Sequence, residues 1–172
     1  RPFNSLEKAL ATIEKTKSSS KDYTIHLTGT QTAQSTMASG RAWVVPAGIK
    51  SLTIVGDKGL NASGMPDAVL NGNKKGSVLE AKSNLILKNV QITGGYANGS
   101  GAAQNGGGIY IDSGVNVTLD SGTLIGDVII PEENAAATKS SCGNYAYNYG
   151  GGIHMEDATL VVKSGAKICH NY

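Results

Sequence analysis

The feature that most constrains this chain is a set of short segments in which apolar and polar residues alternate, each followed closely by turn residues. These segments are Tyr23–Leu27, Ser51–Val55, Asn84–Leu87, Asn116–Leu119 and Thr159–Val162. Leu52 aligns with Leu85, Leu85 with Val117, and Leu119 with Val162. A motif, Gly-Gly-Gly-Ile, occurs at 106–109 and again at 150–153, each time before such a segment. Period-two strands that recur at similar intervals indicate a stacked repeat architecture.

The type of stack follows from what surrounds these segments. No helical periodicity occurs after residue 17, which excludes helical solenoids, and no Asn-Gly hairpin signal joins neighbouring segments. Strands this short, repeated one coil apart, favour pairing between equivalent strands of successive coils. The sequence therefore predicts an all-β fold, a right-handed single-stranded parallel β-helix over residues 22–172, with a long insertion near 127–149.

The N-terminal segment 4–16 differs from the rest, because Leu6, Leu10 and Ile13 fall on one face of a helix. We expect this helix to cap the first coil. No comparable segment closes the last coil, and exposed strand edges invite pairing with other chains. The expectation is therefore a single β-helix domain over 1–172. It is either a fragment of a longer protein or self-associates edge to edge at its C-terminal coil.

Composition limits the classes of partner and location. The formal net charge is +2, with 15 basic and 13 acidic residues, which argues against a nucleic-acid partner. No apolar run approaches the length of a membrane span, so no membrane insertion is expected in this segment. Low charge with abundant Asn, Gly, Ser and Thr is typical of exported bacterial proteins, which favours an extracellular or cell-surface location. Cys142 and Cys169 form either a disulfide or two free thiols.

The two Gly-Gly-Gly-Ile copies suit coil corners, where glycine permits positive φ and close backbone approach. Together with Ile168-Cys-His-Asn171, they resemble the repeats of bacterial polymorphic outer-membrane proteins, which carry GGA[ILV]-like and FxxN-like motifs. The resemblance covers residues 105–172 well and 78–104 loosely. Gly stands for the motif alanine, Leu124 or Ile168 for its phenylalanine, and Asp127 for one asparagine.

The region from the helix to Gly56 resembles the start of pectate-lyase-like β-helices. Taken together, these resemblances imply a right-handed β-helix on the cell surface that serves adhesion or host contact. They name no ligand.

One outer face of the predicted stack carries ionisable side chains in two columns. These are Glu80, Lys82, Tyr110, Asp112, His154 and Glu156. Asp112 and Glu156 are expected on adjacent coils, about 4.8 Å apart, where carboxylates raise one pKa or share a cation such as calcium. If the chain is an enzyme, Asp112, His154 and Glu156 are its catalytic candidates. The alternative is an ordinary solvated face.

A lyase needs a second cation besides Lys82 in this cluster. The two arginines, Arg1 and Arg41, lie outside the repeats, which argues against a catalytic role. We therefore favour a role without catalysis and without a cofactor, and calcium remains the one ion considered.

Tyrosines and asparagines gather near the insertion, a composition typical of recognition loops. The candidate binding residues are Tyr96, Asn98, Tyr110, Asn144, Tyr145, Tyr147, Asn148 and Tyr149. The sequence thus favours an adhesin-like binding module that recognises a glycan or a host or matrix protein through loops. The alternatives are a polysaccharide lyase or glycoside hydrolase acting on the side face, and a structural spacer. For the tyrosines themselves, the alternative is a loop that folds back and covers the side of the β-helix.

Overall fold

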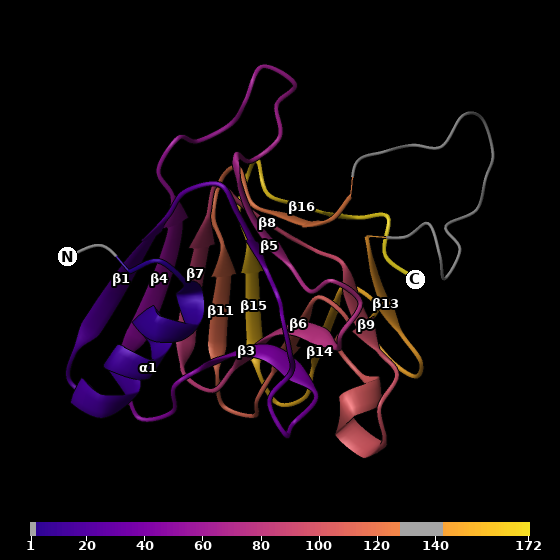
Figure 1. Cartoon of the computed structure of the whole chain (residues 1–172), viewed down its shortest axis with the longest axis horizontal. Coiled ribbons are helices and arrows are strands. Elements are labelled where there is room, and N and C mark those ends of the chain that lie inside the picture. Colours follow the sequence, from indigo (N-terminus) through magenta and orange to yellow (C-terminus); the bar gives the residue numbers. More distant parts are fainter. Residues whose placement is uncertain (1–2, 128–142) are drawn as a thin grey trace.

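The structure, a computed structural model, describes residues 3–127 and 143–172 and is built from parallel sheets that run along a solenoid (Figure 1). Sheet A contains β1 (Asp22–Leu27), β4 (Ser51–Gly56), β7 (Asn84–Lys88), β11 (Asn116–Leu119) and β15 (Thr159–Val162) in that order. Sheet B contains β2 (Thr30–Thr32), β5 (Ala68–Asn71), β8 (Val90–Thr93), β12 (Leu124–Gly126) and β16 (Lys167–Cys169). Sheet C contains β3 (Arg41–Val45), β6 (Ser77–Ala81), β10 (Ile109–Ile111) and β14 (Ile153–Met155). A fourth, two-stranded sheet pairs β9 (Gly95–Ala97) with β13 (Asn144–Ala146).

Each of the first four coils contributes one strand to each of the three main sheets, and the last coil contributes β15 and β16. Every pairing between these strands is parallel, which confirms the predicted β-helix. The predicted register of sheet A is also confirmed. Leu52 pairs with Leu85 and Leu85 with Val117, and Leu119 pairs with Val162 across the longer interval. These inward side chains are fully buried through Leu119, because alternation directs every second residue into the coil.

Helix α1 (Leu6–Thr16) closes the N-terminal end of the stack, as predicted. Ser5 is its N-cap and accepts a hydrogen bond from the backbone N–H of Lys8. Leu6, Ala9, Leu10 and Ile13 are buried against the first coil. The indole N–H of buried Trp43 donates to Glu7 at 2.7 Å, which ties the helix to β3.

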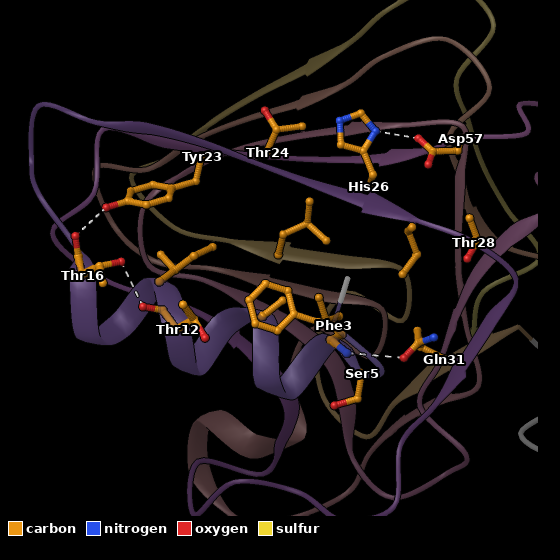
Figure 2. Close-up of a pocket in the computed structure, with 15 residues that line it drawn as sticks. Phe3, Ser5, Thr12, Thr16, Tyr23, Thr24, His26, Thr28, Gln31 and Asp57 are labelled. Carbon is orange, nitrogen blue, oxygen red and sulfur yellow. Dashed lines mark hydrogen bonds and ion pairs between the residues drawn. The ribbon is translucent and has the colours of Figure 1, made fainter. Parts of the chain in front are cut away.

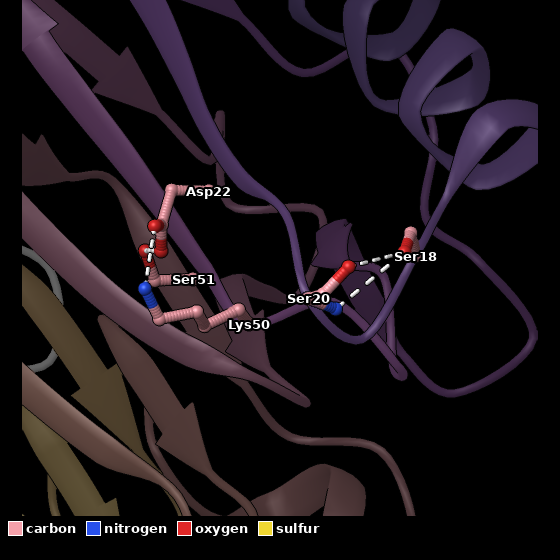
Figure 3. A network of polar contacts seen from close by, with 5 residues as sticks. All are labelled: Ser18, Ser20, Asp22, Lys50 and Ser51. Atoms are coloured by element: carbon pink, nitrogen blue, oxygen red, sulfur yellow. Dashed lines mark hydrogen bonds and ion pairs between the residues drawn. The ribbon is translucent and has the colours of Figure 1, made fainter.

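The turn after α1 is stabilised by polar contacts at the surface (Figure 3). The Ser18 and Ser20 hydroxyls lie 3.0 Å apart. Asp22, at the start of β1, accepts from the Lys50 ammonium at 2.8 Å and from the Ser51 hydroxyl at 2.6 Å. These bonds lower the pKa of Asp22 and join β1 to the coil that follows it.

The two glycine runs stack on each other and serve the role predicted for them. Gly107 and Gly108 donate their N–H groups to the carbonyls of Gly150 and Gly151, at 3.1 and 3.0 Å. Gly106 and Gly150 have φ of +67° and +65°. A Cβ atom on Gly107 would lie 2.5 Å from the Gly151 carbonyl oxygen, so side chains are excluded where the backbones approach.

The structure corrects the residue that we assigned to the asparagine position of the FxxN-like motif beginning at Leu124. Asn144 pairs with Gly95 on one side and with Asn171 on the other, so Asn144 holds the position that we assigned to Asp127. The predicted insertion also ends earlier than expected, because Asn144–Ala146 forms strand β13. Residues 128–142 of that insertion lie outside the described residues.

At the other end of the stack, Val161, Val162 and Ile168 of β15 and β16 are between 43 and 47% exposed. Edge-to-edge association through this coil stays a prediction. Within the described residues, no helix is both long and apolar enough to cross a membrane.

Candidate functional site: a cleft over sheet C

The predicted columns of ionisable side chains lie on the outer face of sheet C. Tyr110 pairs with Glu80 on one side and with His154 on the other, which confirms the expected register. Ile109 and Ile111 point into the core on either side of Tyr110 and are buried. The backbone alternation of β10 therefore directs Tyr110 outward, toward the same face as Glu80 and His154.

Four side chains from three coils form a continuous stack across this face. The Arg41 guanidinium carbon lies 4.4 Å from the centre of the Tyr110 ring. The Tyr110 and His154 rings are stacked with centroids 5.1 Å apart, and those of His154 and Tyr149 are 6.3 Å apart. Arg41 and His154 cover the two faces of Tyr110, so this ring has no free face on which a sugar could stack.

Arg41 is a charged group that is almost completely buried, with 2% of its surface exposed. Its Nη2 donates to the Ala102 carbonyl at 2.8 Å, whereas Nε and Nη1 are buried without a hydrogen-bond partner among the described residues. Burial lowers the pKa of Arg41, and the charges of Glu80, Tyr110 and Asp112 oppose that shift. The guanidinium therefore retains unused donors beside acidic neighbours.

Glu80 likewise has a buried polar atom without a hydrogen-bond partner among the described residues, in this case an acceptor. It is 7% exposed, and its Oε1 lies 3.6 Å from the Lys82 ammonium. Its Oε2 is buried and has no hydrogen-bond partner in the described part of the chain. An unpaired buried carboxylate oxygen and two unpaired guanidinium nitrogens are costly for folding, which makes this region a candidate for ligand recognition.

A cleft of about 750 Å³ lies over these groups. Its lining includes Arg41, Glu80, Tyr110 and Asp112, together with Ser39 and the segment that contains the 3₁₀ helix η1 (Gly101–Gln104). The η1 segment approaches closely because Gly40 has no side chain: a Cβ atom there would lie 2.9 Å from the Cβ of Ala103. Ala102 of the same segment accepts the hydrogen bond from Arg41, so η1 covers the guanidinium.

The placement of Arg41 corrects an expectation from the sequence. Arg41 is not outside the repeats, because β3 is the first strand of sheet C and Arg41 pairs there with Ser77. The cluster therefore contains a second cation besides Lys82. No Gly-Gly-Gly-Ile motif precedes β3, so the motif spacing gave no signal for this strand.

The three residues named as catalytic candidates are arranged unevenly. Asp112 lines the cleft, whereas His154 is 8% exposed and is covered by Tyr110 and Tyr149. The His154 Nε2 lies 3.4 Å from Glu156 Oε1 without hydrogen-bond geometry, and the Glu156 side chain is 77% exposed. The described residues include no group of three or more His, Cys, Asp or Glu side chains that fits a metal ion, so calcium gains no support here.

The tyrosine-rich segment divides into a structural and an exposed part. Tyr145 is 6% exposed and its ring stacks between those of Tyr96 and Tyr172, with centroids 4.8 and 5.7 Å away. Asn144 is completely buried: its Oδ1 accepts from the Gly95 N–H, and its Nδ2 donates to the Ile92 carbonyl and to Asn171 Oδ1, each at 2.9 Å. All of these groups hold the coil together, and a ligand contact of Asn144 stays a prediction.

The other predicted binding residues lie at the surface. Tyr147 and Tyr149 are 62 and 67% exposed, and Asn98 and Asn148 are exposed as well. The Asn148 amide donates to Gln104 Oε1 at 2.7 Å, which links this turn to η1 beside the cleft. Tyr149 contacts His154, which stacks on the cleft residue Tyr110, and Tyr149 has the exposed ring that Tyr110 lacks.

The predicted pairing of Cys142 with Cys169 is not tested, because Cys142 lies outside the described residues. The Cys169 sulfur lies 3.5 Å from the Asp127 carbonyl oxygen, and burial raises the pKa of its thiol.

Fold and site together define this chain as a parallel β-helix protein with a charged cleft on one sheet. In comparisons with known proteins, no family model, no curated protein and no solved structure matches the chain.

Proposed function

We propose that this chain is a bacterial cell-surface β-helix module that binds a glycan in the cleft over sheet C. The observation that carries the proposal is the presence at this cleft of buried Arg41 and Glu80, whose Nε, Nη1 and Oε2 atoms have no hydrogen-bond partner in the described residues. The low charge of the chain and its resemblance to outer-membrane protein repeats support the location.

Glycan hydroxyls match these unused atoms. A hydroxyl both donates and accepts a hydrogen bond, so two neighbouring hydroxyls satisfy the guanidinium donors and the Glu80 oxygen together. A purely acidic or purely basic ligand would satisfy one group and repel the other. The exposed ring of Tyr149, next to His154 on the same face of the stack as Tyr110, offers an apolar face for a further sugar ring.

Access to Arg41 requires movement of the segment that covers it. The Arg41 Nη2 bond to Ala102 is one of the contacts that hold η1 over the guanidinium, and the bond from Asn148 to Gln104 is another. Gly99 and Gly101 precede these residues, and glycine tolerates the backbone changes that opening demands. In this proposal the ligand replaces the Ala102 carbonyl as the acceptor for Arg41.

The test is binding of neutral and charged oligosaccharides to the whole chain on a glycan array, followed by titration of each positive glycan. We expect Glu80→Gln to weaken binding about tenfold or more, because charged hydrogen bonds contribute about 1.5–3 kcal/mol. Glu14→Gln, on the exposed side of α1, is the matched control and should bind as the wild type does. Tyr149→Ala should weaken binding as well.

Equal binding by Glu80→Gln and Glu14→Gln would refute the cleft as the site. Absence of any glycan ligand would leave a protein ligand or a spacer role as the better reading. Because Arg41 supplies a second cation beside Asp112, the same glycans should be checked for release of sugar products. Turnover that disappears in Asp112→Asn would replace the binding role with an enzymatic one.

A further inference from the structure

A second cavity, of about 540 Å³, lies between α1 and β1 (Figure 2). Unlike the charged cleft, this cavity has mostly apolar walls. The helix contributes Leu6, Ala9 and Ile13, together with Thr12 and Thr16. The other wall is formed by every residue of β1 from Tyr23 to Leu27 and by Thr28, which includes inward and outward side chains alike. A wall with both kinds of side chain is the edge of a strand rather than the face of a sheet.

The groove exists because α1 is fixed toward β3 and bridged to the neighbouring strands at its ends. The Tyr23 hydroxyl donates to the Thr16 carbonyl at 2.8 Å, and the Leu6 N–H donates to Gln31 Oε1 at 3.3 Å (Figure 2). Between these two bridges the strand runs for about five residues, or about 17 Å. The groove therefore has the length of one short strand.

The edge of β1 that faces away from β4 has no neighbouring strand among the described residues, because β1 is the first strand of sheet A. The carbonyls of Lys21 and Leu27 accept hydrogen bonds from Lys50 and Asp57 on the β4 side. Backbone groups in a ladder alternate in direction, so those of Thr24 and His26 point to the unpaired edge. These groups require hydrogen-bond partners that an apolar molecule does not supply.

The ladder of sheet A indicates which side chains would fit there. Tyr23 lies in the column that continues with Leu52 and Leu85, and Ile25 in the column of Ile54 and Leu87. A further strand on β1 would place its inward side chains in the same columns, beside Leu6 and Ile13 of α1. Those side chains must be apolar, because the surrounding columns are buried.

The charged side chains of the groove further limit the kind of ligand that it can bind. Among the residues that line the groove are one histidine, His26, and one carboxylate, Asp57, and the His26 Nδ1 lies 2.6 Å from the Asp57 Oδ1. The described residues that line the groove include no lysine or arginine to pair with an acidic peptide. We propose that the groove between α1 and β1 binds an uncharged, extended peptide segment with alternating apolar residues, which adds to the edge of β1 as a strand. This site is separate from the glycan cleft and does not depend on it.

The experiment uses a probe copied from this chain, the acetylated and amidated hexapeptide Ser-Leu-Thr-Ile-Val-Gly of β4 with a fluorescent label, and measures its anisotropy with the whole protein. Thr24→Pro removes the N–H that points to the unpaired edge and leaves the bonds to β4 intact, whereas Thr24→Ala keeps that N–H. We expect the wild type and Thr24→Ala to bind alike, and Thr24→Pro to bind about tenfold more weakly or not at all. Thermal unfolding of each variant verifies its fold.

A second probe keeps the test decisive if Thr24→Pro does not fold. The same hexapeptide with N-methyl groups on alternate amides cannot pair with a strand edge, and we expect it not to bind the wild type. Equal binding of both peptides, or of the Pro and Ala variants, would show apolar contact without strand addition and would overturn the proposal. So would absence of saturable binding by the wild type, or shifts of the Thr24 and His26 amide signals with protein concentration, since a second copy would then occupy the edge.

Discussion

Arg41 and Glu80 are expected to reduce the stability of this fold, and a double-mutant cycle measures by how much. Both side chains are buried, and three of their polar atoms have no hydrogen-bond partner in the described residues. Replacing a buried charged pair with apolar residues of similar volume is often neutral or stabilises a protein by about 1–4 kcal/mol. The opposing loss is the Arg41 bond to Ala102 and the contact with Tyr110, together about 2–4 kcal/mol.

The four proteins of the cycle are the wild type, Arg41→Met, Glu80→Met and the double variant. The charge of Glu80 favours the charged form of Arg41, so each single change leaves the other buried charge without this interaction, which costs up to about 3 kcal/mol. In the double variant no buried charge remains, so we expect its free energy of unfolding to lie within about 2 kcal/mol of the wild type. The single changes are therefore strongly non-additive.

Urea unfolding at neutral pH, followed by circular dichroism, gives the four free energies. A double variant destabilised by the sum of the two single losses would refute the reasoning, because Arg41 and Glu80 would then act as independent structural groups. A stable double variant that no longer binds glycan would separate folding from recognition. Such a result would mean that the pair is retained for its ligand and not for the fold.

Three further predictions concern the stack itself. Asn144→Ala should destabilise the protein by about 2–4 kcal/mol in urea unfolding, because the Gly95 N–H and the Ile92 carbonyl lose their buried partner; an unchanged midpoint would contradict this role. Gly107→Ala should cost about 3 kcal/mol or more by the same measurement, since its Cβ atom would meet the Gly151 carbonyl oxygen of the next coil. Hydrogen bonds lower the folded-state pKa of Asp22, chiefly from Lys50, and of Asp120, chiefly from the Ser121 N–H. The two carboxylates therefore stabilise the fold above their unfolded-state pKa, and this stabilisation should be lost as the pH falls through their folded-state pKa. Asp120→Asn should reduce this pH dependence of the free energy of unfolding.

The strands could be predicted from the sequence because alternation and burial follow the same period of two. Leu52, Leu85 and Val117 repeat at the same place in each coil, and each is fully buried. Asn144 could not be placed in this way, because the residues between Asp127 and Asn144 separate two halves of one motif. Its position is defined instead by its pairing with Asn171, a contact between coils.

The tyrosines near the insertion show where alternation alone is insufficient. Tyr145, Tyr147 and Tyr149 are each two residues apart, so a continuous strand would direct all three to one face. The strand β13 ends at Ala146, and the chain then turns. Tyr145 is therefore stacked within the coil, while Tyr147 and Tyr149 extend into solvent. The segment is rich in tyrosine both before and after Ala146, but only the tyrosines after it, Tyr147 and Tyr149, are exposed and accessible to a ligand.

Arg41 illustrates why a site in this fold is better sought by column than by motif. Its strand lacks the glycine motif, and its ring partner Tyr110 is 69 residues further along the chain and two strands away in sheet C. The contact arises because a long side chain on one coil reaches past the small residue Ser77 of the next. Stacking converts such distant positions into neighbours at each 4.8 Å step. A charged residue on the outer face of any coil therefore belongs to the chemistry of the coils on both sides of it, whatever motif its own coil carries.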